Sequence, residues 1–477
     1  MSTSRTILKN SVWLLIANVS VRFISAFVIV LLARKLGVAG FGQYSFAVSF
    51  VGFFALFTSF GFNSLLIRNI AKDRSLTSKY INNILSIKII FSVLAMIALA
   101  ISCFFINKPE MVIIAIYILG IELVVASFTE SMRSIFQAYE KMEYDSILRI
   151  ISKIIWAVLV LLVIYNNLTL VNITLATLVS ASLGLIITYI VVRKNILKIK
   201  LEADYKFWKK LVLAALPFAL TSLFSMINFR IDQVMLSFMT TDAIVGAYSA
   251  AYKIIDVLAI LPGILVTALY PVFSKYHATD TRLLKKTFNL SLRYVITLSI
   301  PIVIGGFLLS GPLINLVYGP EYADSAMVLK ILIFISLFGF INSPLFVLLN
   351  SIDKQKITMI NTAFTALANI VMNAILIPKY GIIGAAFATI VSEITFLILS
   401  AYQIRKSGIE LNLLSKAYKP LISSIVMGVF VWYFISWNIF ILIPVAALIY
   451  FIVLYLLKEF DKEDIDIVKE ILKKRKK

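Results

Sequence analysis

Cysteine and histidine are almost absent from the sequence. The 477 residues include one of each, Cys103 and His277. A disulfide framework needs paired cysteines, and the common zinc sites need several Cys or His ligands. We therefore expect no disulfide, no metal site and no cofactor.

Charged residues are also scarce. They make up 14% of the chain, hydrophobic residues make up 61%, and the mean hydropathy is +0.97. Soluble domains are typically about a quarter charged and about half apolar. Runs without charge recur along nearly the whole chain, and a membrane-spanning helix needs about 20 such residues. The sequence therefore predicts an all-α polytopic membrane protein.

Polar breaks divide the apolar runs into about fourteen predicted transmembrane helices. These lie near residues 11–33, 42–66, 81–106, 110–134, 147–165, 170–192, 210–238, 243–273, 287–310, 325–350, 357–377, 381–403, 418–437 and 439–457. Some of the runs exceed the length that a hydrocarbon core of about 30 Å requires, so we expect tilted helices or extensions beyond the membrane.

The net charge of +21 is concentrated on alternate loops. With the N-terminus in the cytoplasm, 35 of the 45 Lys and Arg residues fall on cytoplasmic segments and four fall on outside loops. Such a bias sets membrane orientation, so it predicts that both termini face the cytoplasm and that the helix number is even. The excess of positive charge is then explained by topology, and we expect a multi-pass protein of the cell membrane that does not bind nucleic acid.

Short segments recur in order about two hundred residues apart. Gly42-Gln43-Tyr44-Ser45 returns as Gly246-Ala247-Tyr248-Ser249, and Ala176-Thr177-Leu178-Val179-Ser180 returns as Ala388-Thr389-Ile390-Val391-Ser392. The repeats predict two pseudo-symmetric lobes of six helices, residues 1–200 and 201–408. Residues 409–477 would add helices 13 and 14 and a basic cytoplasmic tail. Transporters built from such repeats bind substrate between them.

The glycines and serines of the first repeated segment have a predicted structural role. Small side chains allow helix backbones to approach closely in membranes. We therefore expect helices 2 and 8 to pack closely at their outer ends, around Gly42 and Gly246.

Several charged residues fall inside predicted helices, where each one costs about 2.5–3.5 kcal/mol if it faces lipid. Helical spacing places polar residues on one face of each of helices 1, 7 and 8, which predicts a shared internal cavity. The predicted substrate-binding residues are Arg22, Lys253, Asn18, Arg230 and Tyr252. The candidate ion-coupling residues are Asp232 and Asp256.

Structural roles remain open for these and other charges. Lys253 and Asp256 lie one helical turn apart and would neutralise each other, and Arg230 would have another partner or snorkel. A packing or hydrogen-bonding role is favoured for Glu122, and Lys88 is expected to snorkel or to lie at the entrance of the cavity.

The segment "SVWLLIANVSVRFISAFVIVLLARKLGVAGFGQYSFAVSF", residues 11–50, resembles the opening of Wzx-type oligosaccharide flippases. These belong to the multidrug/oligosaccharidyl-lipid/polysaccharide exporter superfamily. "LPFALTSLFSMINFRIDQVMLSFMTTDAIVGAYSAAYKI", residues 216–254, is similar to the seventh and eighth helices of that family, with Asp232 in its usual place. The resemblance implies a bundle of two six-helix lobes with a cationic central cavity, which Arg22 and Lys253 fit.

The resemblance implies flipping of an isoprenoid (di)phosphate-linked oligosaccharide by alternating access, with membrane lipid and other polysaccharide-assembly membrane proteins as partners. A lipid II flippase and a cation-coupled multidrug antiporter of the same superfamily remain alternatives. An antiporter would need an acidic cavity, so Arg22 and Lys253 argue against it. A membrane glycosyltransferase or polymerase is less favoured because the longest outside loop, about residues 311–324, is short. We therefore expect a transporter without enzyme activity.

Overall fold

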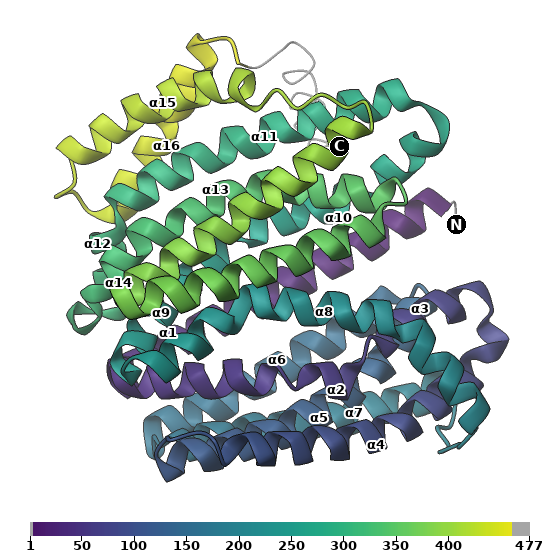
Figure 1. Cartoon of the computed structure of the whole chain (residues 1–477). Helices are drawn as coiled ribbons and strands as arrows, with labels where there is room; N and C mark the ends of the chain where they lie inside the picture. The colour runs from purple at the N-terminus through teal and green to yellow at the C-terminus, as the bar shows by residue number, and fades with distance from the viewer. Residues whose placement is uncertain (1–2, 460–477) are drawn as a thin grey trace, which may run out of the picture. The chain divides into compact units, whose positions relative to one another are not determined.

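The computed structural model describes residues 3–459, without the side chains of residues 3–8, 11, 267 and 268, and is almost entirely helical (Figure 1). The predicted basic tail, residues 460–477, lies outside the described residues. The helices are α1 (Thr3–Gly52), α2 (Ala55–Ser59), α3 (Phe62–Lys72), η1 (Arg74–Leu76), α4 (Thr77–Cys103), α5 (Glu110–Ala138), α6 (Met142–Asn166), α7 (Leu170–Asn195), α8 (Tyr205–Met239), α9 (Asp242–Leu258), α10 (Ile260–Thr279), α11 (Thr281–Leu308), α12 (Ser310–Tyr318), η2 (Pro320–Tyr322), α13 (Asp324–Ser351), α14 (Gln355–Lys406), α15 (Leu413–Tyr433) and α16 (Ile439–Leu456).

Twelve helical stretches within the described residues are long and apolar enough to cross a membrane, which confirms an all-α polytopic membrane protein. Two of them are far longer than a bilayer requires, Val12–Gly52 with 41 residues and Gln355–Lys406 with 52. Each contains a non-helical glycine, Gly37 with φ 69° and Gly381 with φ 55°. A side chain would disfavour these positive φ values. Both glycines fall at or beside breaks that the sequence predicts between helices. The total of fourteen helices and the orientation of the termini stay predictions.

The chain forms two compact units. The first unit contains the residues up to Ile260 together with Met359–Ser392, and the second contains Leu261–Thr358 together with the residues from Glu393 onward. In the first unit, one core lies among α3, α4 and α5, and another lies among α1, α6 and α7. In the second unit, α10, α11 and α13 share a core, and α15 and α16 pack with the end of α11.

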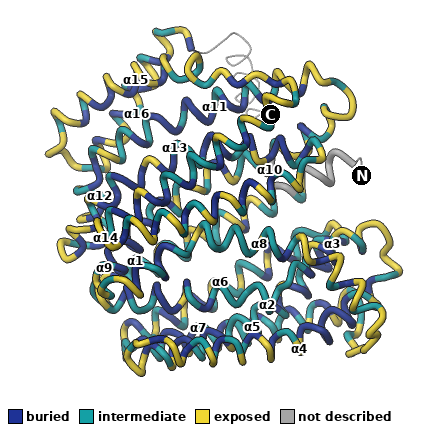
Figure 2. The backbone as a smooth tube through the Cα atoms, in the orientation of Figure 1, coloured by how far each residue is buried: buried dark blue, intermediate teal, exposed yellow. Residues whose placement is uncertain are grey.

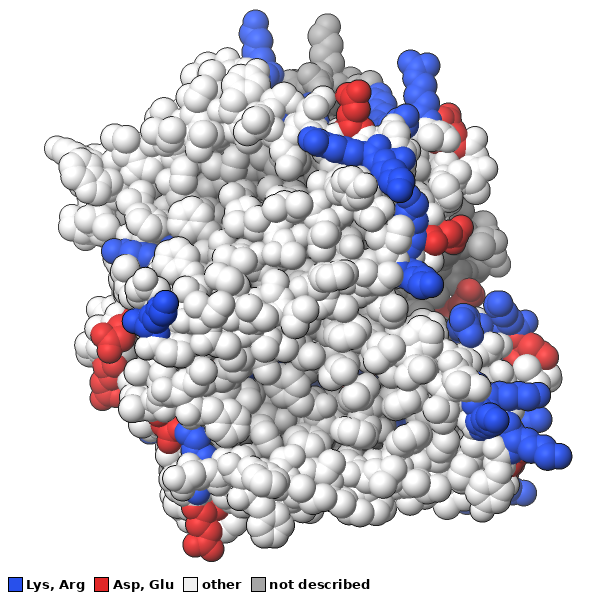
Figure 3. Space-filling model, viewed as in Figure 1, with Lys and Arg blue, Asp and Glu red and all other residues white. Residues whose placement is uncertain are grey.

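The outer surfaces of the helices are apolar. Large side chains such as Phe27, Val93 and Val429 are exposed along the middle of their helices, and Figure 2 shows exposed positions on helices of both units. On the face drawn in Figure 3, Lys, Arg, Asp and Glu gather near helix ends, and the surface between them carries almost no charge. Apolar surface of this extent is unfavourable in water and is suited to contact with lipid.

Within the first unit, α1 and α9 cross at the two repeated glycines. A Cβ atom on Gly42 would lie 1.8 Å from the carbonyl oxygen of Asp242, and one on Gly246 would lie 1.9 Å from that of Val38. The two backbones therefore touch at a point where no side chain fits, which confirms the predicted close packing at these glycines. It is an example of small residues permitting close helix contact in membranes.

Polar contacts flank this crossing. The carboxylate of Asp242, in the first turn of α9, accepts a hydrogen bond from Lys108 Nζ at 2.6 Å and another from Gln43 Nε2 at 3.0 Å. Lys108 precedes α5, and Gln43 belongs to α1. The Asp242 carboxylate therefore joins three segments of the first unit beside the crossing.

We predict that Gly42→Ala destabilises the protein. The new methyl group would contact backbone, which cannot rotate away, and overpacking of this kind costs about 1–3 kcal/mol. The thermal unfolding midpoint in detergent should fall. Gly339→Ala is the matched control, because a Cβ atom there meets no atom within 4 Å. An unchanged midpoint for Gly42→Ala would contradict the close crossing.

Candidate functional site

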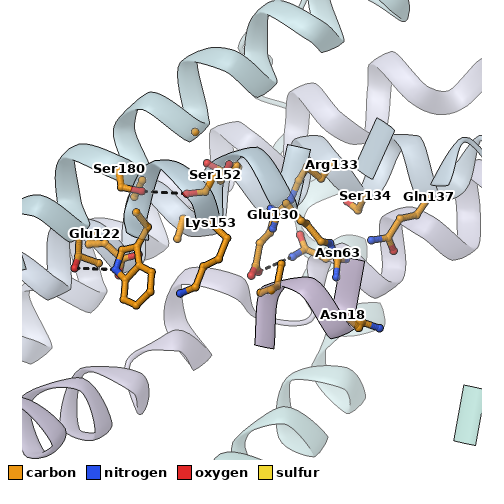
Figure 4. Close-up of a pocket in the computed structure, with 18 of the residues that line it drawn as sticks. Asn18, Asn63, Glu122, Glu130, Arg133, Ser134, Gln137, Ser152, Lys153 and Ser180 are labelled. Atoms are coloured by element: carbon orange, nitrogen blue, oxygen red, sulfur yellow. Dashed lines mark hydrogen bonds between the residues drawn. The ribbon is translucent and has the colours of Figure 1, made fainter. Parts of the chain in front are cut away.

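A polar cavity of about 610 Å³ lies inside the first unit, between α1, α3, α5, α6 and α7 (Figure 4). Its volume is within the range of about 300–1,000 Å³ that is usual for ligand pockets. Its polar and aromatic lining consists of Asn18, Arg22, Asn63, Glu122, Thr129, Glu130, Arg133, Ser134, Gln137, Arg149, Ser152, Lys153, Trp156, Thr177 and Ser180. Four of these residues are cations and two are carboxylates, so the lining carries an excess of positive charge.

One end of the cavity is built on the buried carboxylate of Asp145. This residue lies in the first turn of α6, and Arg149 follows it by one turn. Asp145 Oδ1 accepts a hydrogen bond from Arg149 Nε at 3.1 Å, and Asp145 Oδ2 accepts one from Gln137 Nε2 at 3.0 Å. Arg149 Nη2 lies 2.9 Å from Asp145 Oδ2. Arg133 Nε lies 3.7 Å from the same carboxylate. We call Arg133, Gln137 and Arg149 the cationic end of the cavity.

The Asp145 carboxylate can neutralise only one of the two arginines of the cationic end, and Glu130, three residues before Arg133 on α5, is the nearest other carboxylate of the lining in sequence. Asp145 is fully buried, whereas the side chains of Arg133 and Arg149 are 16% and 30% exposed. The Nε atom of Arg133 has no hydrogen-bond partner among the described residues. A guanidinium carries five donors, so each of these arginines has N–H groups left for an anionic ligand.

Behind the middle of the cavity, a chain of hydrogen bonds leads to a buried lysine. Asn63 Nδ2 donates to Glu130 at 3.5 Å, and Ser131 Oγ donates to Asn63 Oδ1 at 2.7 Å. Lys88 Nζ, which is fully buried, donates to Ser131 Oγ at 2.8 Å and to the carbonyl oxygen of Ser127 at 2.6 Å. The expectation that Lys88 snorkels or lies at the entrance is therefore wrong, because its ammonium is held inside the helix bundle.

The other end of the cavity contains Glu122, Trp156, Thr177 and Ser180. Trp156 Nε1 donates to Thr177 Oγ1 at 3.3 Å, and Ser180 Oγ donates to the carbonyl oxygen of Ser152 at 3.4 Å. The Glu122 carboxylate lines the cavity and has no hydrogen bond to any described residue, so the favoured hydrogen-bonding role is not seen, and the packing role stays a prediction. We call Glu122, Thr177 and Ser180 the acceptor end of the cavity.

Lys153 lies between the two ends, as Figure 4 shows. Its ammonium is 3.2 Å from the centre of the Trp156 ring, a cation–π contact.

Of the residues that the sequence singles out, Asn18 and Arg22 line this cavity. Lys253, Arg230 and Asp256 form a separate group in the same unit. Asp256 Oδ2 lies 3.0 Å from Lys253 Nζ and 3.5 Å from Arg230 Nη2. The guanidinium of Arg230 also lies 5.8 Å from the Tyr252 ring centre. These four residues do not line the cavity, although the three charged side chains remain about a quarter to a third exposed.

Asp232 lies in a third polar group of the first unit and is fully buried. Its carboxylate accepts hydrogen bonds from the Tyr248 hydroxyl, from Thr389 Oγ1 at 3.4 Å and from the Gln233 amide at 3.0 Å. Both Tyr248 and Thr389 belong to the repeated segments that the sequence reveals. The group therefore connects α8, α9 and α14.

Sequence reasoning missed Arg133, Arg149 and Lys153. It counted the basic residues of segment 133–153 as cytoplasmic, although the predicted helices 110–134 and 147–165 contain these three. The structure places them inside α5 and α6, in the wall of the cavity. A signal was present in the sequence: positions 122, 126, 130, 133 and 137 of α5, and 145, 149, 152 and 156 of α6, repeat with the period of one helical face.

Comparison with known proteins identifies the family. The family model described as Polysaccharide biosynthesis protein matches residues 7–277, and the MatE model matches residues 217–375. The "Putative O-antigen transporter" of Shigella flexneri is 25% identical over 395 residues, which cover 80% of this chain and 94% of that protein.

Solved structures show the same fold. The lipid II flippase MurJ, in an inward closed conformation, has a TM-score of 0.74 at 20% identity and covers 92% of this chain and 97% of its own. An inward-facing multidrug resistance MATE family transporter of the MOP superfamily has a TM-score of 0.64 at 16% identity and covers 81% of this chain and 95% of its own. The matched family model spans more than half of the sequence, and the predicted resemblance to Wzx-type flippases is confirmed. The chain therefore belongs to the polysaccharide biosynthesis protein family, within the multidrug/oligosaccharidyl-lipid/polysaccharide exporter superfamily.

Proposed function

We propose that this protein flips an isoprenoid (di)phosphate-linked oligosaccharide from the cytoplasmic to the outer leaflet by alternating access, for the assembly of cell-surface polysaccharide or glycan. The observation that carries the proposal is the cationic end of the cavity, where Arg133 and Arg149 share the single buried carboxylate of Asp145. The name of the Shigella flexneri relative, "Putative O-antigen transporter", supports the same class of substrate.

The phosphate group would bind to the free N–H groups of Arg133 and Arg149, with Arg22 as a third cation of the same lining. Arginine binds phosphate oxygens through two parallel hydrogen bonds, which fixes orientation as well as charge. Outward movement of one negative charge is favoured by about 2.3 kcal/mol per 100 mV across a membrane that is negative inside. The membrane potential would therefore help to drive the phosphate outward.

The Lys253, Arg230 and Asp256 group would be a second station for the anionic headgroup, with Tyr252 beside it. Asp256 holds both cations while the station is empty, so it lowers the cost of keeping them in the membrane. A phosphate would then displace part of this ion pairing. The excess of cations over carboxylates argues against a multidrug antiporter, which would need an acidic cavity.

The proposal includes a location and an arrangement. The protein would lie in the cell membrane with both termini in the cytoplasm, as the distribution of Lys and Arg predicts. Residues 1–200 and 201–408 would be the two rocking lobes, and residues 409–477 would add the last two helices and the tail. Other membrane proteins of polysaccharide assembly would be its partners.

The α1–α9 crossing would be the outer gate. Opening to the outside requires that the backbones at Gly42 and Gly246 separate and that Asp242 releases Lys108 and Gln43. The ion pair would hold the gate closed while substrate enters from the cytoplasm.

We predict that removal of the cationic end slows flipping. The double variant Asp145→Asn/Arg149→Gln removes the arginine without stranding a buried carboxylate. A hydrogen bond to a charged group contributes about 1.5–3 kcal/mol, so the rate should fall at least about tenfold. The rate is measured as flipping of a fluorescent polyprenyl diphosphate oligosaccharide in proteoliposomes. The variants Arg22→Ala and Lys253→Ala should also slow this flipping.

Arg193→Gln is the control for this series, because Arg193 is an exposed arginine in the last turn of α7. Wild-type rates in folded Asp145→Asn/Arg149→Gln protein would exclude the cationic end as a phosphate site. Transport of lipid II alone among lipid-linked saccharides would favour the lipid II alternative. Uptake of a cationic dye without any flipping would favour the antiporter.

We predict that Lys108→Met loosens the outer gate. Breaking a buried ion pair by removing one partner costs about 3–5 kcal/mol, and this pair is 10% and 19% exposed. In a Cys103→Ser background, Ser45→Cys beside the crossing should react with a membrane-impermeant maleimide at least about tenfold faster once Lys108 is replaced. The exchanged pair Lys108→Asp/Asp242→Lys should restore slow labelling. Equal labelling rates in all these variants would show that the ion pair does not hold the gate.

Asp232 would couple flipping to an ion, with Asp256 as the second candidate. The buried Asp232 carboxylate is surrounded by hydroxyl groups of Tyr248 and Thr389, which suit a bound proton or Na⁺.

We predict that a proton or Na⁺ gradient changes the wild-type flipping rate in proteoliposomes. In Asp232→Asn, the ratio of rates with and without the gradient should fall to about one, because the neutral amide does not bind a cation electrostatically. A wild-type flipping rate that is the same with and without each gradient would refute coupling to an ion.

A further inference from the structure

The two ends of the cavity in the first unit have opposite hydrogen-bonding character. At the cationic end, Arg133, Gln137 and Arg149 present N–H donors around Asp145. A guanidinium has no acceptor atom, so this end is complementary to a ligand group that brings only acceptors. A phosphate is such a group.

At the acceptor end, the hydrogens of the hydroxyl groups are already used inside the protein. Thr177 Oγ1 donates to the carbonyl oxygen of Ile173 at 2.9 Å and accepts from Trp156 Nε1 at 3.3 Å, and Ser180 Oγ donates to the carbonyl oxygen of Ser152 at 3.4 Å. Their remaining lone pairs can only accept. The Glu122 carboxylate adds two acceptor oxygens without a hydrogen bond to any described residue. The Lys153 ammonium, over the Trp156 ring, is the cation beside these acceptors. Apart from it, this end is complementary to a ligand that brings several donors.

The spacing of the ends fits one extended ligand. Glu122 and Arg133 both belong to α5, and their positions are about 16 Å apart along the helix axis. Figure 4 shows Glu122 and Ser180 at one side of the cavity and Arg133 and Gln137 at the other, with Lys153 between them. Such a span accommodates a diphosphate together with the sugars that are bonded directly to it.

We propose that the acceptor end, Glu122 with Thr177 and Ser180, is a binding subsite for the hydroxyl groups of the sugars next to the diphosphate. The subsite rests on the proposed function, since it assigns the sugar part of the same substrate. A polar site that hydrogen-bonds a substrate discriminates strongly against an analogue without the bonding groups, because its own buried polar atoms are then left unpaired. The acceptor end therefore makes the transporter select glycosylated lipid over the bare lipid diphosphate.

Two fluorescent probes test this selection in proteoliposomes. One is a bare polyprenyl diphosphate, and the other is the same lipid bearing N-acetylglucosamine, galactose or glucose, each measured separately. Wild-type protein should flip at least one glycosylated probe faster than the bare probe. Glu122→Gln removes the carboxylate without changing its shape, and the ratio of glycosylated to bare rates should fall about tenfold. Thr177→Val provides a second, independent variant of similar volume.

The controls separate the subsite from the phosphate site. Asp145→Asn/Arg149→Gln should slow both probes and leave their ratio unchanged. Glu110→Gln, an exposed carboxylate in the first turn of α5, should change neither rate. A ratio that is unchanged in folded Glu122→Gln and Thr177→Val overturns the sugar subsite, while flipping by the wild type still supports the proposed function. If the wild type moves the polyprenyl diphosphate oligosaccharide but none of these probes, the subsite is overturned and the proposed function stands. If it moves neither, the proposed function fails and the subsite fails with it.

Discussion

The cost of placing charge inside a membrane determines much of this structure. A cation that faces hydrocarbon costs about 2.5–3.5 kcal/mol on insertion scales, so every charge within the helices must have an internal partner or a polar cavity. Asp145 shows how the first unit meets this requirement. It is fully buried, and it holds Arg149, Gln137 and Arg133 around one carboxylate. Because the same contacts fix the three donors in position, the group that lowers the cost of the cations also organises the cationic end of the cavity.

Close contact between helix backbones is the second constraint, and it applies to helix surfaces that carry no charge. The apolar surfaces of membrane helices gain no hydrophobic energy by leaving lipid, so tight association needs close packing and hydrogen bonds. At the α1–α9 crossing, Gly42 and Gly246 allow the backbones to touch. The Asp242–Lys108 pair adds an ionic contact beside them. The glycine contact itself has no long side chains to rearrange, so it is suited to close and separate as a unit.

Most of the fold could be predicted from the sequence, because hydropathy and small-residue repeats are local signals. The runs of apolar residues predict the long helices, and the predicted breaks include or adjoin Gly37 and Gly381, where positive φ interrupts the helical backbone. The candidate site was harder to predict. Asn18 and Arg22 do line the cavity. Arg149 and Lys153 were counted with a cytoplasmic segment, because basic residues near helix ends usually indicate membrane orientation. Which charges point inward depends on how α5, α6 and α7 pack, and that information is not contained in any one segment.

A carboxylate between two cations occurs twice in the first unit, and the two carboxylates differ in burial. Asp145 lies between Arg133 and Arg149, and Asp256 lies between Arg230 and Lys253. In both groups one carboxylate lies between two cations, so it can neutralise only one of the two positive charges that it contacts. The difference is exposure, since Asp145 is fully buried and the Asp256 side chain is 33% exposed. A buried carboxylate fixes its arginines in one geometry, which suits recognition. A more exposed one is screened by water and releases its partners at lower cost, which suits a station that a headgroup occupies and leaves.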